Sequence, residues 1–549
     1  MSAVTNNKSI TSKFTFPNEA NKLHAILNTT WDFVVIGSGI GGATFGYRMA
    51  EKGYRVLFVE KGQSADIKNQ YPEQVKNFAK NPLSLLKRAN REWQTLDDIN
   101  LTSPQKSKHF IPYIGSGIGG SSKLYGMVFE RFNPSEFTNP TSPWPVSAET
   151  MQYYYDRVAQ MFHLKTKNIQ SKANLEIIHK LKQVGIETYS LTKAKLEGNC
   201  SGCQGHVCTC NQKVDAETAC IQPAIEKWGA EIITECEVIQ INTQPDDSSV
   251  ESISIKIDYL PDQVFKIFSK NFALAAGALA SPSLLLKSNT QKKPDGIANS
   301  SGQVGKNMMR HLIDIYGLWT WKKPESQIDI KEFGAKNLIF DTDENRHKGL
   351  LQSFGRFPHI KTVLHEISTN IQNPIVKYAF HCVAPVVGLV LNYLFRRMIF
   401  VATILEDSPT KANQVFQPTP KGKIQFHYQV SDKDEKQLLK LRKLMQQKLN
   451  SFFTIKLYQA HSNDRIAHVC GTCRMGTNPQ TSVVDASGRS HDLPNLWIVD
   501  ASVFPSSGSG NPSFTIAANA LRCADLVADK SYHMASSSTK VATNTFAAP

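Results

Sequence analysis

The segment from Trp31 to Gly62 constrains the fold of this chain more than any other feature of its sequence. Phe33–Ile36 is a continuous apolar run, too short for a helix and typical of a strand that is buried on both faces. Gly37, Gly39 and Gly42 follow it at GxGxxG spacing. We expect the first glycine to allow a sharp turn, the second to let the backbone approach a pyrophosphate, and the third to let a helix pack on the strand. The segment therefore predicts the start of a dinucleotide-binding unit.

The second strand of this unit ends on an acidic residue. We expect the helix to run to about Lys52 and to end at Gly53, because glycine is favoured directly after a helix. Tyr54–Val59 then forms the second apolar strand, and Glu60 follows it. A carboxylate in this place can accept hydrogen bonds from the hydroxyl groups of a ribose. The complete order of strand, glycines, helix, strand and acid is far more specific than GxGxxG alone.

Length and charge restrict the classes of protein that remain. A chain of 549 residues exceeds the usual limit of one hydrophobic core, so we expect two domains or more. The formal net charge of +15 could favour an acidic membrane surface, nucleic acid or another anionic partner. Because no dense basic run with interleaved aromatic residues occurs, we interpret the charge as dispersed over a solvated surface and expect no nucleic-acid partner.

Two stretches bear on localisation. Residues 1–30 are polar and lack an apolar core of signal-peptide length, which favours a cytoplasmic protein. The most apolar later stretch, Val383–Phe395, is about half of what spans a bilayer, and Arg396 and Arg397 close it. We interpret this stretch as a buried helix or as a helix of a substrate-binding domain. Weak contact with the membrane interface, which would make the protein peripheral to the membrane, stays open as the alternative.

A second glycine cluster occupies Gly115–Ser122. Small residues in this number let backbone lie against a flat or charged ligand, and the hydroxyl groups of Ser121 and Ser122 can donate hydrogen bonds to it. An ordinary flexible turn is the alternative interpretation of this cluster alone. Gly277–Leu286 is a further place where a strand ends in small residues and opens a helix, so backbone N–H groups could meet a nucleotide there.

Half of the ten cysteines gather in one loop, and a CxxC occurs later in the chain. In a cytoplasmic protein this clustering argues against a disulfide framework and for a metal, a cluster or a redox pair. The spacing fits no zinc template, an iron–sulfur cluster is one alternative, and packed reduced thiols are the other. The candidate cluster ligands are Cys200, Cys203, Cys208 and Cys210, with Cys220 at the end of the loop. For the CxxC at Cys470 and Cys473 we favour packed thiols over a redox disulfide.

The C-terminal part carries the clearest chemical features. His468–Gly476 places a histidine beside small residues, and a later predicted strand ends at Asp500. Asn511 and Pro512 precede a helix that we expect to reach about Asp529. Proline is tolerated in the first turn of a helix because its missing N–H group is not needed there. The positive end of this helix would stabilise an anion placed before it.

From Trp31 to about Asp529, these segments resemble the glucose-methanol-choline (GMC) oxidoreductases, a family of FAD enzymes. Four motifs match in order: the first glycine fingerprint, Gly119–Ser122, Gly277–Leu286, and the paired segments at His468 and Asn511. The cysteine-rich loop is similar to that of a bacterial branch whose substrates are mostly undefined. The resemblance implies an α/β fold (α+β overall), with a Rossmann-like FAD-binding domain assembled from discontinuous segments plus a sheet-containing substrate domain.

The predicted domains follow from this resemblance. They are a polar N-terminal segment (1–30), the FAD-binding domain (31–140, 222–310 and 466–530), the substrate-binding domain (141–221 and 311–465) and a disordered Ser-, Thr- and Ala-rich tail (531–549). We find no recognisable catalytic constellation between Val304 and about Arg465.

The resemblance also implies the roles of individual residues. A histidine at the position of His468 accepts the alcohol proton while hydride leaves the carbinol carbon for flavin N5. Its partner in the family is histidine or asparagine and corresponds to Asn511, whose amide can hold the hydroxyl group but cannot act as a base. Tyr125 stands where many relatives have asparagine, so that local contact differs. The residues assigned to the cofactor are Gly37, Gly39, Gly42, Glu60, Gly119, Gly120, Ser121, Ser122, Val238, Asp500, Ala501 and Pro512.

We therefore predict an FAD-dependent oxidoreductase that oxidises the CH–OH group of an alcohol, polyol or sugar-like substrate to a carbonyl. A dehydrogenase is favoured over an oxidase, because the cysteine loop could pass electrons to an acceptor that the sequence does not identify. Two alternatives stay open: an FAD-containing lyase of the same fold, and a non-catalytic membrane-associated flavoprotein.

Overall fold

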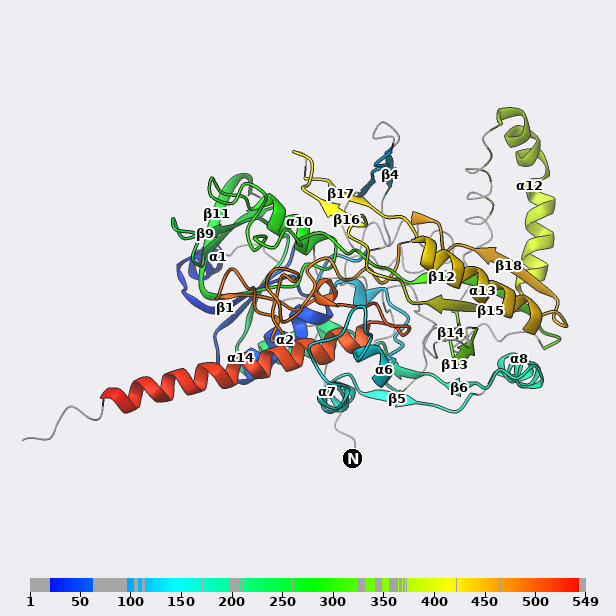
Figure 1. Cartoon of the computed structure of the whole chain (residues 1–549), viewed down its shortest axis with the longest axis horizontal. Coiled ribbons are helices and arrows are strands. Elements are labelled where there is room, and N and C mark those ends of the chain that lie inside the picture. Colours follow the sequence, from blue (N-terminus) through cyan, green and yellow to red (C-terminus); the bar gives the residue numbers. More distant parts are fainter. Residues whose placement is uncertain are drawn as a thin grey trace, which may run out of the picture.

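The computed structural model describes most of the chain and contains two main sheets, which lie side by side in Figure 1. One is built around β1 and β11, and the other around β12 and β15. The described residues are 20–62, 96–102, 107–110, 114–169, 171–197, 208, 212–258, 260–322, 331–340, 348–354, 364, 368, 371, 373–420, 422–463 and 466–542.

The first sheet has seven strands and the order β8-β2-β1-β11-β10-β9, with β19 paired to β11. Its strands are β1 (Trp31–Ile36), β2 (Val56–Val59), β8 (Glu231–Ile233), β9 (Cys236–Thr243), β10 (Val250–Ile257), β11 (Leu260–Leu274) and β19 (Leu496–Ile498). The pairs β1–β2, β1–β11, β2–β8 and β11–β19 are parallel, whereas β9, β10 and β11 pair in antiparallel fashion. Parallel strands thus come from distant parts of the chain, as the predicted discontinuous Rossmann-like domain requires.

The strand–helix–strand unit at the start of this sheet agrees with the prediction. All residues of Phe33–Ile36 are buried, as expected for a strand covered on both faces. The helix α2 (Ile40–Glu51) is followed by Gly53, which has a φ of +88°. That left-handed conformation is readily adopted by glycine and ends the helix. The second strand begins at Val56, two residues later than predicted.

The second sheet has six strands and the order β18-β12-β15-β14-β13-β6, all antiparallel. These strands are β6 (Tyr189–Ser190), β12 (Leu312–Trp319), β13 (Phe333–Ile339), β14 (Lys348–Ser353), β15 (Met398–Leu405) and β18 (Thr454–Tyr458). Two smaller sheets contain β3 (Leu96–Asp98), β4 (Lys108–Phe110), β16 (Gln414–Phe416) and β17 (Ile424–His427), and β5 (Leu164–Thr166) and β7 (Thr192–Ala194). The domain boundaries proposed above stay a prediction.

Several helices start where a serine caps the first turn. The side chains of Ser147, Ser171 and Ser431 accept hydrogen bonds from backbone N–H groups in the first turns of their helices. Besides α2 and the helices α12 and α14 described below, the helices are α1 (Ala20–Asn28), α6 (Pro134–Phe137), α7 (Ala148–Met161), α8 (Lys172–Gln183), α9 (Gln222–Trp228), α10 (Ala280–Lys287), α13 (Asp432–Lys448), the short 3-10 helices η2 (Gly120–Lys123) and η5 (Ala501–Val503), and the π-helix η3 (Glu217–Ile221).

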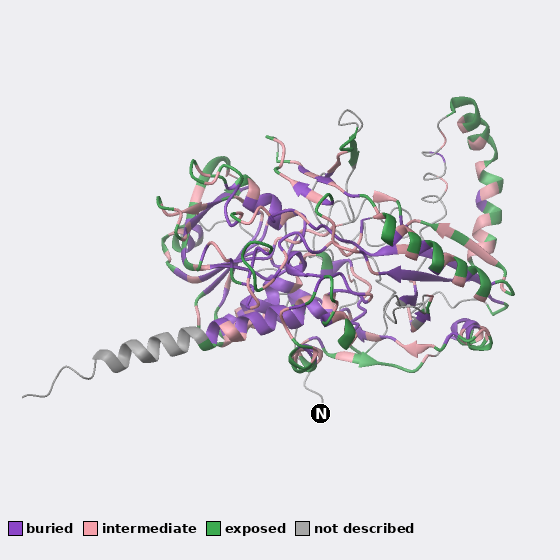
Figure 2. Cartoon of the chain, viewed as in Figure 1, coloured by how far each residue is buried: buried purple, intermediate pink, exposed green. Residues whose placement is uncertain are grey.

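The C-terminal helix is longer than predicted. α14 (Ser513–Ala542) continues well past Asp529, so residues 531–542, predicted to be disordered, are helical. The sequence of this extension contains no glycine or proline, and a helix that is already formed can propagate through such residues. The Ser-, Thr- and Ala-rich composition of residues 531–542 therefore indicated disorder wrongly, because a polar segment can still extend a helix. Figure 2 shows that the first half of α14 is buried in the body of the protein.

The most apolar stretch forms α12 (Pro374–Phe395), which joins β14 to β15. It begins nine residues before the predicted stretch, and Asn373 caps its first turn. Gly388 is the single buried residue of the helix, so the interpretation as a buried helix is wrong. Figures 1 and 2 show α12 standing out from the body, with most of its surface exposed or half-exposed. An apolar sequence indicates surface that avoids water, but it does not say what covers that surface.

Candidate active site

The first glycine segment forms a tight turn between β1 and α2. Gly37 has a φ of +95°, and a Cβ atom on Gly42 would lie 2.1 Å from the carbonyl oxygen of Gly37. The predicted roles in turning the chain and in packing the helix are therefore confirmed. A Cβ atom on Gly39, in contrast, would meet nothing within 4 Å. This open space fits the close approach of a pyrophosphate to the backbone.

The second glycine cluster lies against the first. A Cβ atom on Gly120 would lie 3.1 Å from the Cα atom of Gly39, and one on Gly62 would lie 2.3 Å from the backbone nitrogen of Gly117. Gly119 and Gly120 both have positive φ angles, of +89° and +53°. Two segments that are far apart in sequence therefore meet with no room for side chains between them.

The two serines of this cluster differ in their contacts. The hydroxyl group of Ser122 donates to the carbonyl oxygen of Gly119 at 2.6 Å and accepts from the backbone N–H of Ala216 at 3.0 Å. Contrary to our expectation, it is engaged within the protein rather than directed to a ligand. Ser121 is exposed, and its hydroxyl oxygen accepts from the backbone N–H of Gly115 at 3.2 Å. Its proton is thus still able to serve a ligand.

Glu60 holds three loops together. One carboxylate oxygen accepts from the backbone N–H and the hydroxyl of Ser38, at 3.0 and 2.6 Å. The other accepts from the backbone N–H groups of Gly62 and Gly117, both at 3.0 Å. These four donors occupy the lone pairs of the carboxylate. A ribose could therefore bind to Glu60 only by taking the place of one of them.

Val238 lies on β9, whose first residues adjoin this loop. The backbone N–H of Cys236, which begins β9, donates to the carbonyl oxygen of Glu60 at 3.0 Å. Val238 is half-buried and packs on the core of the first sheet. Val238, which was predicted to bind the cofactor, therefore follows by two residues the one that contacts Glu60.

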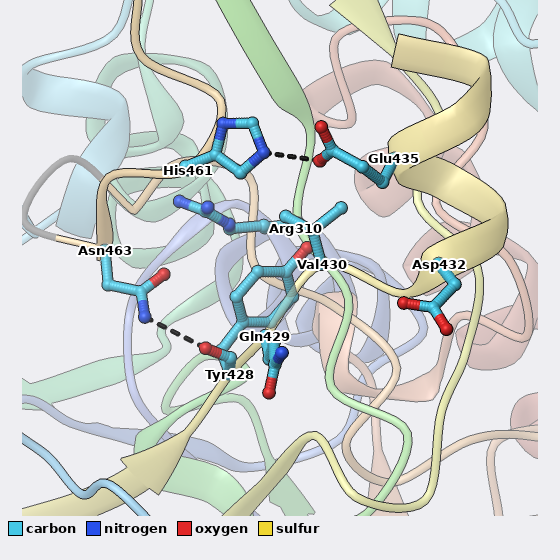
Figure 3. Close-up of a pocket in the computed structure, with 8 residues that line it drawn as sticks. All are labelled: Arg310, Tyr428, Gln429, Val430, Asp432, Glu435, His461 and Asn463. Atoms are coloured by element: carbon cyan, nitrogen blue, oxygen red, sulfur yellow. Dashed lines mark hydrogen bonds and ion pairs between the residues drawn. The ribbon is translucent and has the colours of Figure 1, made fainter. Parts of the chain in front are cut away.

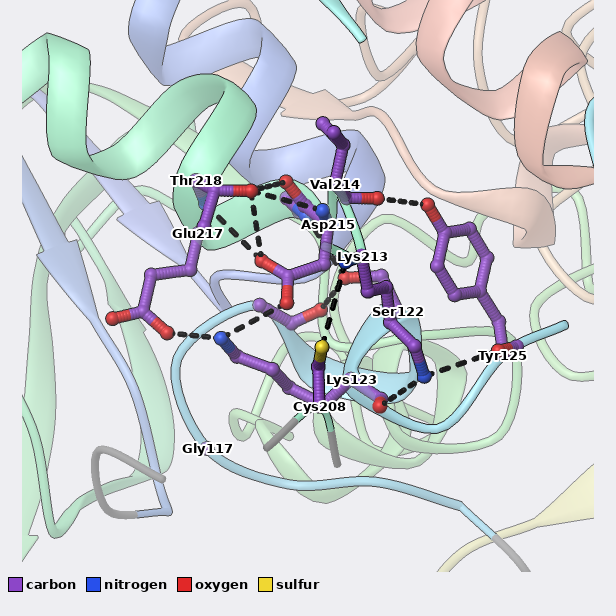
Figure 4. A network of polar contacts seen from close by, with 12 residues as sticks. Gly117, Ser122, Lys123, Tyr125, Cys208, Lys213, Val214, Asp215, Glu217 and Thr218 are labelled. Atoms are coloured by element: carbon purple, nitrogen blue, oxygen red, sulfur yellow. Dashed lines mark hydrogen bonds and ion pairs between the residues drawn. The ribbon is translucent and has the colours of Figure 1, made fainter. Parts of the chain in front are cut away.

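A buried ion-pair network lies behind the second glycine cluster (Figure 4). The ammonium group of Lys123 reaches Asp215 at 3.1 Å and also contacts Glu217. Burial alone would lower the pKa of Lys123, but the two carboxylates outweigh it and raise the pKa. Tyr125 directs its hydroxyl group to the carbonyl oxygen of Val214. Its phenol therefore stabilises the segment that follows the cysteine loop.

The C-terminal motifs come together with the first glycine segment. The carboxylate of Asp500 accepts from the backbone N–H of Gly277 at 2.8 Å, from the hydroxyl of Ser281 at 2.5 Å and from the backbone N–H of Ser502 at 2.8 Å. A Cβ atom on Gly41 would lie 3.1 Å from the Cα atom of Asp500. Asp500 therefore joins the turn before α10 to η5, beside the start of α2.

The segment that carries His468 runs along η5. Gly471 donates its backbone N–H to the carbonyl oxygen of Ala501 at 3.1 Å. The backbone N–H of Cys473 donates to the carbonyl oxygen of Ser502 at 2.7 Å. His468 itself has a φ of +58°, a left-handed conformation that costs a residue other than glycine about 1–2 kcal/mol. The surrounding hydrogen bonds hold this strained position.

His468 pairs with a histidine that the sequence did not single out. The Nδ1 atom of His311 lies 2.7 Å from the Nδ1 atom of His468, and the two rings are nearly perpendicular. The Nε2 atom of His311 lies 2.8 Å from the carbonyl oxygen of Gly508 and 3.2 Å from that of Ser507. His311 thus connects the His468 segment to the loop before α14.

These contacts define the protonation of both rings. Burial lowers the pKa of His311 to about 4, so its ring is neutral near pH 7. Because carbonyl oxygens only accept, the proton of His311 is on Nε2, and its Nδ1 is an acceptor. Burial also lowers the pKa of His468 well below its usual value, with smaller contributions from His311 and Lys331. The neutral His468 must then donate from Nδ1, which leaves its Nε2 without a proton.

The loop before α14 is held from several sides. The indole of Trp144 donates to the hydroxyl of Ser506 at 2.9 Å, and the backbone N–H of Asp407 donates to the hydroxyl of Ser507 at 3.0 Å. The carboxylate of Glu136 accepts from the backbone N–H and hydroxyl of Ser509, at 2.7 and 2.6 Å. These contacts fix the carbonyl groups to which His311 is bound.

Asn511 has a buried polar group that is not satisfied by the protein. The residue is 7% exposed, and within the described part of the chain its Nδ2 atom has no hydrogen-bond partner. Pro512 follows it, and the carbonyl oxygen of Pro512 accepts from Ile516 in the first turn of α14. An unpaired buried amide costs about 1–3 kcal/mol, so this position favours a bound ligand that accepts a hydrogen bond.

A polar pocket is lined in part by Arg310, the residue directly before His311 (Figure 3). It is lined by Arg310, Tyr428, His461 and Asn463 among others, and by none of the residues predicted to be catalytic or to bind the cofactor. Arg310 lies 4.4 Å from the ring centre of Tyr428, and its guanidinium donates to two backbone carbonyl groups. Arg310 therefore fixes the segment directly before β12, which carries His311.

The cysteine predictions can be followed only in part. Cys200, Cys203 and Cys210 lie outside the described residues. Cys208 accepts a hydrogen bond from the backbone N–H of Lys213 at 3.4 Å, and within the described ranges no group of histidine, cysteine or acidic residues is suited to hold a metal ion. Cys470 and Cys473 are buried free thiols. Burial raises the pKa of both, which disfavours reactive thiolates.

Two protein-family models together match most of this chain. The N-terminal family model of the GMC oxidoreductases matches residues 31–313, and the C-terminal model matches residues 411–520. The first match includes the glycine segments and His311, and the second includes His468, Asp500 and Asn511.

Individual relatives are similar over nearly their whole length. Paromamine 6'-oxidase from Streptomyces fradiae is 25% identical, over 91% of this chain and 91% of its own. The 2-methyl-1,2-propanediol dehydrogenase from Mycolicibacterium austroafricanum is 24% identical, over 90% and 95%. A solved structure of Aspergillus oryzae formate oxidase, studied for its FAD modification, has a TM-score of 0.64 and 14% identity, over 92% of this chain and 99% of that one.

Proposed function

The chain belongs to the GMC oxidoreductase family of FAD-dependent enzymes, and from this premise we propose that it oxidises the CH–OH group of a small alcohol, polyol or sugar-like molecule to a carbonyl. FAD, when bound, supplies the acceptor for the hydride that leaves the carbinol carbon. The residues of this chain bind the cofactor, orient the alcohol and take up its hydroxyl proton.

The residues that would hold FAD fit such a group. The open space above Gly39, with the turn of Gly37 beside it, suits a pyrophosphate. The N terminus of α14 follows Pro512 and offers the positive end of a helix dipole to an anionic ring. The ribose would bind near Glu60 and replace one of its four protein donors. Ser121 offers a free hydroxyl proton at the edge of the second glycine cluster.

The contact between the Nδ1 atoms of His468 and His311 is the observation that carries the proposal, because it leaves Nε2 of a neutral His468 without a proton. A general base must be unprotonated before the reaction, and a neutral imidazole whose other nitrogen is already a donor meets that requirement. When Nε2 takes the proton of the alcohol, Nδ1 keeps its hydrogen bond to His311, so the pair needs no rearrangement. The unpaired Nδ2 atom of Asn511 supports a role in holding the substrate oxygen.

The substrate class follows from the relatives. The two enzymes above are named for the oxidation of paromamine and of 2-methyl-1,2-propanediol, which supports a polyol or sugar-like alcohol here. We retain the dehydrogenase proposal, in which an external acceptor removes the electrons. An iron–sulfur cluster at Cys200, Cys203, Cys208 and Cys210 stays a prediction, and iron analysis of protein purified without oxygen would test it.

An anaerobic titration with a panel of alcohols tests the proposed function. The purified protein should be yellow, and a substrate alcohol should bleach its flavin absorbance while the matching carbonyl appears. Addition of oxygen then separates an oxidase, which recovers its colour at once, from a dehydrogenase, which does not. Product formed while the flavin stays yellow would favour the lyase instead. A folded protein that is colourless and does not bind added FAD would contradict the proposal.

A further inference from the structure

The helix α12 presents a broad apolar surface that no described part of the chain covers. Its exposed large side chains include Ile375, Tyr378, Val386, Leu389 and Tyr393, each at least 62% exposed. Successive members of this set are three, four or eight residues apart, and such spacings place side chains on one face of a helix, so these side chains form a continuous stripe. Contiguous exposed apolar side chains of this size commonly mark a surface that binds a partner or a membrane.

The length and composition of α12 suit a lipid environment. It has 22 residues, and by length and composition it is the helix of the described chain that could cross a membrane. Lys377 is its single lysine or arginine, and it contains no aspartate or glutamate. Leu364 packs against Gly388, on the opposite side of the helix from the stripe. Transfer of such side chains from water into hydrocarbon is favourable.

The connections of α12 indicate how it would meet a bilayer. It leads directly into β15, and the chain before it comes from β14. The strands β14 and β15 are hydrogen-bonded neighbours in one sheet. The chain therefore leaves the body and returns to it on the same side, so α12 suits insertion into the near leaflet better than passage across the membrane.

Aromatic and basic side chains collect where α12 meets the body. The rings of Trp319 and Tyr393 lie 6.5 Å apart, and Trp321 is 73% exposed. The guanidinium of Arg397 donates to the carbonyl oxygen of Trp321 at 3.2 Å, and Arg396 is exposed beside it. Tryptophan and tyrosine favour the membrane–water interface, and arginine favours anionic head groups.

We propose that α12 inserts its exposed apolar face into one leaflet of an anionic phospholipid bilayer, with Trp321, Tyr393, Arg396 and Arg397 at the head-group level. The enzyme is then a peripheral membrane protein that works at the lipid surface. A second copy of this chain is the other candidate to cover the stripe. The helix offers no acid to pair with the basic groups of a partner copy, whereas anionic lipid complements them and the net charge of +15.

Flotation with vesicles tests this proposal. The holoenzyme should float with vesicles of phosphatidylcholine and phosphatidylglycerol, and less well with phosphatidylcholine alone. The double variant Val386→Glu, Leu389→Glu should lose about 100-fold in partitioning, because both side chains leave hydrocarbon and two acids meet an acidic surface. Val264→Glu is the matched control: Val264 is 53% exposed on β11, and this variant should float like the natural protein. Bound flavin and the thermal unfolding midpoint check that each variant is folded.

A fluorescent label distinguishes lipid from self-association. Cys382 is an exposed free thiol on α12, and an NBD group attached to it should brighten and shift to the blue when vesicles are added. Cys382→Ser, treated in the same way, shows how much signal comes from other thiols. Failure of the natural protein to float, or equal flotation of the double variant, would overturn the proposal. Brightening without vesicles, together with a dimer that the double variant dissociates, would assign the stripe to a second copy.

Discussion

The interior site and the helix α12 are both incomplete, but they lack opposite things. Around His468 the protein supplies nearly every hydrogen bond, and a few polar atoms such as Nδ2 of Asn511 have no partner in the described chain. Along α12 the protein supplies almost no cover, and large apolar side chains face outward. The first deficiency suits a small polar ligand that accepts hydrogen bonds. The second suits an extended apolar phase.

This difference implies that the two regions act independently. The polar site depends on angles and protonation, so a single atom out of place stops its chemistry. The apolar helix depends on summed area, so its effects are spread over several side chains. Variants at the site should change turnover and not membrane binding, and variants of α12 should do the reverse. Any variant that changes both would break the comparison.

The largest effect is expected from His468→Ala. Loss of a general base typically costs about 10²–10⁴ in rate, so kcat for a substrate alcohol should fall by about 1,000-fold. The measurement is anaerobic flavin reduction by stopped flow, with the absorbance of bound FAD as the check on folding. Flotation should match that of the natural protein. Normal flavin reduction in this variant would show that another group takes the proton.

The next effect concerns stability in acid. Burial lowers the pKa of His311 from an ordinary value near 6.5 to about 4, so the unfolded state binds this proton first. Its contribution to stability is present above pH 6.5 and is lost as the pH falls toward 4, by about 3 kcal/mol in all. His311→Asn should remove this part of the pH dependence in urea unfolding experiments.

Other groups near His311 also titrate in this pH range, so the natural protein must be compared with the His311→Asn variant. Burial raises the pKa of Glu406 and of Asp407 to about 8, so these carboxyl groups make the protein more stable as the pH falls through 8 toward 4. Lys331, with a pKa lowered by burial to about 8, and His468 are also near. Subtracting the curve of His311→Asn from that of the natural protein cancels the contributions the two share. Curves of the same shape would show that folding does not shift the pKa of His311.

A smaller effect on kcat should distinguish the contact of His311 with His468 from its contact with the loop before α14. Asparagine places an oxygen near the position of Nδ1, so His311→Asn keeps an acceptor for His468. Glutamine reaches toward Ser507 and Gly508, so His311→Gln keeps the contact with the loop and loses the acceptor. A lost buried hydrogen bond costs about 1–3 kcal/mol, which predicts a fall in kcat of about 30-fold for glutamine and much less for asparagine. Equal losses in both would assign His311 a merely structural role.

The sequence predicts the parts of this site that local geometry decides. Gly37 and Gly42 were assigned correctly because the turn after a buried strand needs a positive φ, and a helix packed on that strand leaves no room for a Cβ atom. The strand ends at Glu60 and Asp500 follow from the same short patterns. The hydrogen bonds that the Glu60 carboxylate accepts could not be predicted in this way, because their donors come from three separate loops.

The parts that depend on long-range contacts were not predicted. His311 stands alone in its segment, and its role arises only when folding brings it to His468 and to the loop before α14. Ser122 was expected to serve a ligand, but Ala216 and Gly119 take up its hydroxyl. For α12 the sequence indicated how apolar the helix is, whereas its exposure depends on the absence of any described element that packs over the stripe.

The smallest expected effect comes from the basic rim of α12. A basic residue at an anionic surface contributes about 1 kcal/mol, so the double variant Arg396→Ser, Arg397→Ser should weaken binding to phosphatidylglycerol vesicles by roughly 10–30-fold. Binding to pure phosphatidylcholine should change little, because the apolar stripe is intact. Raising the salt concentration should lower the binding of the natural protein toward that of this variant, since salt screens the head-group attraction. Flavin reduction in solution should be unchanged, because both arginines directly follow α12 and, among the described residues, contact none of the His468 site. A loss that is the same for both kinds of vesicle would show that the arginines stabilise α12 itself rather than contact head groups, and the charge argument for an anionic bilayer would then fail.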